Sequence, residues 1–116
     1  MRHLSKLLLA CAFSTGCATA VPQAQIDSAQ KAIASASDAV GSQAGAAADR
    51  LADAKREYDS AMELSKAGKT DDAVRKLAMS EADGKLAGAL GNEGTTKSQL
   101  QAVNDQIQTL KTQLGK

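Results

Sequence analysis

The sequence predicts an all-α protein, a small antiparallel bundle of about four short helices that follows an N-terminal signal segment. Three observations lead to this prediction. Apolar residues recur at steps of three and four, which is the helical period. Alanine, the best helix former, dominates a composition that is 43% hydrophobic and only 2% aromatic. The alternating pattern expected of a strand occurs nowhere in the sequence.

Residues 1–16 have the pattern of a secretory signal peptide. The basic residues Arg2 and Lys6 precede an apolar stretch at 7–13, and small residues follow it. As a helix this stretch would span about 10 Å, far less than the ~30 Å hydrocarbon core of a bilayer. The pattern therefore predicts export rather than a membrane span.

The end of this segment resembles a lipobox. Thr15 and Gly16 are small and Cys17 follows them, as in bacterial lipoproteins cut by signal peptidase II. The resemblance implies that Cys17 carries diacylglycerol and an N-linked acyl chain such as palmitate, with residues 17–22 as a lipidated tether. By similarity to enteric lipoproteins, the absence of aspartate at position 18 implies an outer-membrane, periplasm-facing protein.

An alternative start of the mature chain stays open. Ser14 stands where lipoboxes usually have leucine, and residues 18–20 fit the small-x-small rule of ordinary signal peptidase. A cut after Ala20 would release a soluble periplasmic protein that begins at Val21, such as a binding module or chaperone. Cys11 is a weaker lipidation site, because a cut there leaves too short an apolar core.

The domain is predicted to occupy residues 23–114, starting after Pro22, since proline is tolerated at a helix start. The first helix ends at Gly41, and residues 41–45 form a loop. The second helix runs from about 46 to 67 and ends at Gly68. The apolar faces of these two helices contain Ile26, Ala29, Ile33, Ala36 and Val40, then Ala47, Leu51, Ala54, Tyr58, Ala61 and Ser65.

Thr70 is the predicted cap of a third helix, with Asp71 and Asp72 in a first turn that favours negative charge. Its apolar arc contains Val74, Leu77, Ala78, Ala82, Leu86, Ala89 and Leu90. Gly84 and Gly88 weaken its later half, because each costs up to about 1 kcal/mol relative to alanine.

The glycine-rich run at 91–94 is the last predicted break. Thr96 and Gln99 match a capping box and begin the predicted fourth helix. Its apolar stripe has the most regular spacing in the chain: Leu100, Val103, Ile107, Leu110 and Leu114. This stripe either closes the bundle or forms a coiled-coil contact with a second copy or a protein partner.

Composition argues against catalysis, a metal site and nucleic-acid binding. The single histidine, His3, and one of the two cysteines leave with the signal, so nucleophile–base pairs of the usual kinds are missing. Asp49, Asp53 and Glu57 share one helix face, where a solvated surface is a simpler interpretation than a metal or acid–base site. The 14 basic and 13 acidic residues nearly cancel, which leaves no basic surface for nucleic acid. We therefore expect no enzyme activity and no cofactor besides the lipid.

Lys116 gives the chain a weak resemblance to the Braun-type murein lipoproteins, which are small, alanine-rich and helical. In that family a C-terminal lysine is joined to peptidoglycan, so the resemblance implies attachment through Lys116. Two features argue against it. Leu114 and Gly115 precede the lysine where tyrosine and arginine are typical, and the glycine-rich breaks predict a folded height of only about 30 Å.

A second resemblance covers residues 23–90. The residues that carry it are Ala29, Ile33, Leu51, Ala54, Ala61, Gly68, Asp72, Ala73, Leu77, Ala78, Glu81, Ala82 and Ala87. In these residues the chain resembles a family of alanine-rich bacterial envelope lipoproteins known as a domain of unknown function, whose members occur alone or ahead of an OmpA-like domain. The resemblance implies a helical hairpin in an envelope lipoprotein, with no catalytic residues to carry over, and no OmpA-like domain follows here.

Overall fold

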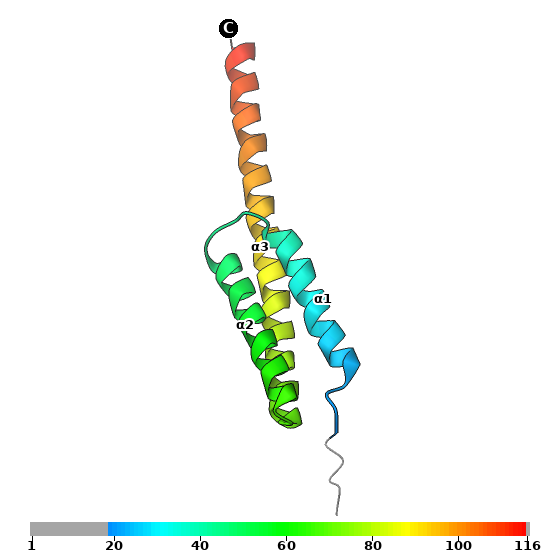
Figure 1. Cartoon of the computed structure of the whole chain (residues 1–116). Helices are drawn as coiled ribbons and strands as arrows, with labels where there is room; N and C mark the ends of the chain where they lie inside the picture. The colour runs from blue at the N-terminus through cyan, green and yellow to red at the C-terminus, as the bar shows by residue number, and fades with distance from the viewer. Residues whose placement is uncertain (1–18, 116) are drawn as a thin grey trace, which may run out of the picture.

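Three α-helices make up residues 19–115, the part of the chain that the computed structural model describes (Figure 1). Helix α1 spans Gln23–Val40, α2 spans Ala46–Lys66 and α3 spans Thr70–Leu114. No strand occurs in this described part, so the all-α prediction is confirmed. The predicted fourth helix is wrong as a separate element, because its residues are the second half of α3.

Helix α3 is the helix against which the other two pack. Both α1 and α2 pack along its first half and contact each other much less. Figure 1 shows α3 running on past the loop between α1 and α2, with nothing of the chain beside its last turns. Its 45 residues reach about 67 Å at 1.5 Å per residue, so the predicted height of about 30 Å is also wrong.

The glycines predicted to lie in the two turns do lie at helix ends. Gly41, Gly45 and Gly68 have φ angles of 53°, 92° and 74°, a region that side chains with a Cβ rarely adopt. Gly41 ends α1, Gly45 precedes α2, and Gly68 lies in the turn into α3. These three glycines fix the two turns of the bundle.

The glycines inside α3 have a different role, which explains why the break predicted at 91–94 is wrong. A Cβ on Gly84 would lie 3.0 Å from the Cβ of Ala32, and one on Gly91 only 2.7 Å from the carbonyl carbon and oxygen of Ala39. Glycine therefore lets the backbone of α1 approach α3 closely. The gain in packing outweighs the weak helix propensity of these residues.

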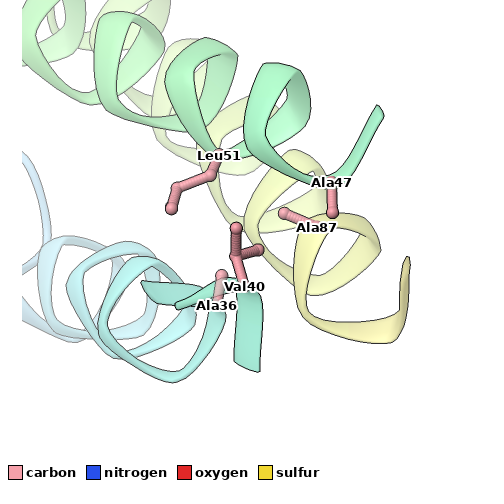
Figure 2. Close-up of a cluster of buried hydrophobic side chains, with 5 residues drawn as sticks. All are labelled: Ala36, Val40, Ala47, Leu51 and Ala87. Carbon is pink, nitrogen blue, oxygen red and sulfur yellow. The ribbon is translucent and has the colours of Figure 1, made fainter. Parts of the chain in front are cut away.

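The core consists of two small clusters between the helices. Figure 2 shows the cluster near the α1–α2 loop, formed by Ala36, Val40, Ala47, Leu51 and Ala87. The side chains of α1, α2 and α3 meet in this cluster, and four of its five residues are the ones expected on the apolar faces. Its three alanines bury little area each, so close helix approach has to supply the packing.

The second cluster lies toward the α2–α3 turn and contains Ala29, Ala61 and Leu77. Tyr58 packs against it, and the Tyr58 hydroxyl accepts a hydrogen bond of 2.7 Å from the Gln30 amide. Tyr58, expected on the apolar face of the second helix, thus packs at the edge of the core with its hydroxyl bonded to α1.

The N-terminus of α3 differs in detail from the prediction. Thr70 is its first residue rather than its cap; the cap is Lys69, which makes no side-chain capping bond. The Thr70 hydroxyl instead donates to the carbonyl of Thr19 at 2.6 Å. Asp71 and Asp72 do lie in the first turn, as expected.

Candidate docking surface on the third helix

The residues of α3 from 95 to 114, here called the tail, extend beyond the bundle and expose an apolar surface. Five side chains form it, and we call them the tail stripe: Leu100, Val103, Ile107, Leu110 and Leu114, with exposed fractions of 61%, 49%, 43%, 56% and 86%. The stripe therefore does not close the bundle, and that alternative is wrong. The coiled-coil alternative stays a prediction.

The polar side chains of the tail bind its own backbone. The hydroxyls of Ser98, Thr109 and Thr112 donate to the carbonyls four residues earlier, at 2.9–3.1 Å. Thr96 does the same to Asn92 at 2.9 Å, so the capping box predicted at Thr96 and Gln99 is not formed. Helix α3 is thus continuous through the region where a start was expected.

One ion pair lies where the tail leaves the bundle. The Lys97 ammonium is 2.7 Å from a Glu93 carboxylate oxygen, one helical turn away. The hydrogen bond from Lys97 and its charge lower the pKa of Glu93, and the same contact raises the pKa of Lys97. Both groups stay charged at neutral pH and largely neutralise each other.

Gln43, in the loop between α1 and α2, joins the bundle to the start of the tail. Its amide nitrogen lies within hydrogen-bond distance of three acceptors: the carbonyl oxygens of Ala39 and Gly91 and the hydroxyl of Thr95, at 3.2, 3.1 and 3.1 Å. Its amide oxygen occupies the space that a Cβ on Gly94 would need. Sequence reasoning missed this residue, because nothing in a loop glutamine indicates that it will cross to another helix.

Asp49, Asp53 and Glu57 of α2 do not converge on a site: Asp49 is exposed, whereas Asp53 and Glu57 are half-buried and paired with basic side chains. Asp53 pairs with Arg50 and Arg56, and Glu57 lies 2.7 Å from Lys76 of α3. Within residues 19–115, no group of three Asp, Glu, His or Cys side chains is placed to hold a metal ion. The position of Lys76 was not predictable, since it depends on how α2 and α3 pack.

A groove of about 570 Å³ runs between α1 and α3. It exists because small residues face each other there, among them Ser35, Ala36, Gly84 and Gly88. The groove has no apolar lining residue larger than alanine. It offers a ligand little contact area, so the tail stripe is the better candidate surface.

The two predicted attachment residues, Cys17 and Lys116, lie outside the described residues. The structure does place the segment that follows Cys17. Thr19 is bonded to Thr70, and Val21 packs against the cluster that contains Leu77. Residues 19–22 thus lie at the end of the bundle opposite the tail (Figure 1).

No helix among residues 19–115 is both long enough and apolar enough to cross a membrane. No known protein family, curated protein or solved structure matches the chain in comparisons of its sequence and fold. The resemblances to envelope lipoproteins therefore rest on the residues that carry them and stay predictions.

Proposed function

We propose that this chain is a non-catalytic lipoprotein of the outer membrane, anchored through Cys17 and facing the periplasm, whose helical domain organises the envelope by docking a protein. The observation that carries the docking role is the tail stripe. Five large apolar side chains on a helix that has left its own bundle are unusual on a protein without a partner, because exposed apolar patches of this kind mark interaction sites.

The arrangement of the two ends supports an anchored protein. Residues 19–22 lie at the α2–α3 turn, and the tail points away from them (Figure 1). An anchor just before Thr19 would hold the bundle close to the membrane surface. The tail stripe would then project into the periplasm by most of the ~67 Å length of α3.

The bond between Thr70 and Thr19 favours Cys17 over Val21 as the first residue. A cut after Ala20 would remove the Thr19 carbonyl, which accepts the Thr70 hydroxyl at 2.6 Å. A cut before Cys17 keeps this contact. The soluble periplasmic binding module or chaperone that begins at Val21 is therefore the less favoured alternative.

The test is the intact mass of the protein taken from its native envelope, combined with labelling by radioactive palmitate. We expect a chain that begins at Cys17 and carries acyl groups, and we expect Cys17→Ala to abolish labelling and membrane retention. Cys11→Ala is the matched control and should change neither. An unmodified chain beginning at Val21 would refute the anchored protein.

One observation favours a second candidate, attachment to peptidoglycan through Lys116. The geometric objection to this function was a folded height of about 30 Å, and the continuous 45-residue α3 removes it. Deleting Lys116 should then release the protein from purified murein, while Lys111→Ala on the same helix should not. An unchanged murein-bound fraction after the deletion would eliminate this candidate.

A further inference from the structure

The tail stripe continues along the outer face of α3 beside the bundle. Two more large apolar side chains, Met79 and Leu86, are 48% and 43% exposed there. They lie seven residues apart, and Leu100, Ile107 and Leu114 follow at multiples of seven. With Val103 and Leu110 between them, and the exposed Ala82 and Ala89 at the equivalent places, these residues form one line that we call the outer stripe.

The outer stripe is separate from the face that α3 buries in the bundle. The buried residues also follow a three–four spacing: Ala73, Leu77, Ser80, Gly84, Ala87 and Gly91. Met79 and Leu86 each follow a buried residue by two positions, which places them about 200° around the helix. Helix α3 therefore carries two stripes on nearly opposite sides, and α1 and α2 cover only one of them.

The spacing and length of the outer stripe are those of a coiled-coil seam. Residues 79–114 hold about five heptads, more than the three or four that indicate a coiled coil. They span about 53 Å, and a contact strip about 10 Å wide gives at least about 500 Å² on each of two copies. The total reaches the ~1,000 Å² expected of a specific interface, whereas the tail alone supplies about half of it.

We propose that the protein docked on the tail stripe is a second copy of this chain, which covers the whole outer stripe and forms a parallel dimer along α3. A partner for this seam must offer an equally long free helix with the same seven-residue spacing, and α3 itself has both properties. In the tail, four of the six flanking positions are neutral amides, Gln99, Asn104, Gln106 and Gln113, and the other two are Lys97 and Lys111. Two copies therefore repel little there, and a charged partner gains little.

The parallel orientation rests on the proposed function, since two copies anchored at their N-terminal ends in one membrane must run in the same direction. In that register Glu93 and Thr96 form the one polar stretch of the seam. Lys97 is 2.7 Å from Glu93 in the same helix and compensates its charge. Polar residues at seam positions such as these two specify the register of a coiled coil at some cost in stability.

The experiment is cross-linking of single-cysteine positions in isolated envelopes that carry the full chain, using a short bis-maleimide. Val103→Cys in the tail and Ala89→Cys beside the bundle should each give a covalent dimer of twice the chain mass. Asp105→Cys is the matched control, since it is exposed in the same tail on the side away from the stripe. The wild-type chain measures any background from Cys17.

A charge in the bundle half tests whether the seam is continuous. Leu86→Lys combined with Val103→Cys should lower the cross-linked fraction at least tenfold, although position 86 lies about 25 Å from position 103. Gln101→Lys in the same background should leave it unchanged. Circular dichroism of both variants confirms that the helices are intact, so a loss reports the interface.

The inference is overturned if neither cysteine cross-links, if Asp105→Cys cross-links as well as they do, or if the product contains a different protein. Palmitate labelling of the same envelopes separates this inference from the proposed function. A labelled chain without cross-links refutes the dimer alone. An unlabelled chain that still cross-links supports the dimer and refutes the anchor.

Discussion

The two halves of α3 are one continuous helix, yet they are stabilised in different ways. In the bundle half, residues 70–94, one face is buried by α1 and α2 through alanine, glycine and a few larger side chains. In the tail, larger aliphatic side chains are exposed, and the polar side chains bind their own backbone. The residues with the greatest capacity for burial thus lie where this chain does not bury them.

Apolar spacing alone therefore does not indicate which side of a helix is buried within its own chain. The bundle half buries small residues because close helix approach gives them many contacts. The tail keeps large residues at heptad spacing because, on our proposal, its partner is another chain. Making the same change in both halves of α3 tests this difference directly.

The largest expected effect comes from truncating matched leucines. Leu77 is only 2% exposed in the bundle half, so Leu77→Ala should lower the free energy of unfolding by about 2–4 kcal/mol through lost burial and a residual cavity. Leu100 is 61% exposed, and Leu100→Ala should change the monomer by no more than about 0.5 kcal/mol. Urea denaturation followed by circular dichroism, at concentrations that keep the protein monomeric, measures both.

Equal losses for the two leucines would contradict the comparison, because they would mean that the tail packs within its own chain. If the proposed dimer forms, repeating the denaturation at higher protein concentration distinguishes the two variants in a second way. Only Leu100→Ala is expected to weaken a stability that rises with protein concentration, as mass action requires of a dimer.

The next largest effect comes from replacing two glycines of the bundle half with alanine. The two substitutions should change the free energy of unfolding in different directions. A Cβ at position 91 would lie 2.7 Å from the Ala39 carbonyl, which is backbone and cannot move aside, so Gly91→Ala should cost about 1–3 kcal/mol. A Cβ at position 88 would lie 3.7 Å from the Ala36 Cα, an ordinary contact. Gly88→Ala should therefore be neutral or stabilise by up to about 1 kcal/mol.

Thermal unfolding of the two glycine variants measures this difference. If Gly91→Ala stabilises the protein as much as Gly88→Ala does, then the close approach of α1 to α3 is wrong. The glycine at 91 would then be the weak point in the helix that its sequence first suggested.

These glycines also show how far the sequence could lead. The helical class, both turns and the faces of α1 and α2 follow from local spacing and from glycines that adopt positive φ. Gly91 and Gly94 stand in a short glycine-rich run, as Gly41 and Gly45 do, but they lie inside a helix. Whether a glycine ends a helix or admits a neighbouring backbone depends on what packs against it, and one chain's sequence does not contain that information.

The candidate surface was predictable in part for the same reason. The spacing of Leu100, Val103, Ile107, Leu110 and Leu114 identified the stripe, because heptad spacing is a local property. Its exposure was not predictable, since it depends on α1 ending beside Gly91 and on the α1–α2 loop turning back there. Leu86 was assigned to a broad apolar arc together with Leu77, and only the packing separates the two: Leu86 is 43% exposed and Leu77 is buried.

The smallest expected effect is a loss of helix stability at the start of the tail in acid. Lys97 lowers the pKa of Glu93 in the folded chain, so the pair contributes stability above the unfolded pKa of a glutamate, and this contribution is lost as pH falls through the lowered value. The protection of the amides at residues 95–100, which is the exchange rate corrected for the intrinsic effect of pH, should therefore fall once the pH drops below the usual pKa of a glutamate, because the tail has no neighbouring helix to hold its first turn. Glu93→Gln should remove this pH dependence. Glu63→Gln, which breaks a similar exposed pair with Lys66 at the end of α2, should leave exchange in the tail unchanged. If the amide protection in the tail changes with neither pH nor Glu93→Gln, this ion pair does not stabilise the helix where it leaves the bundle.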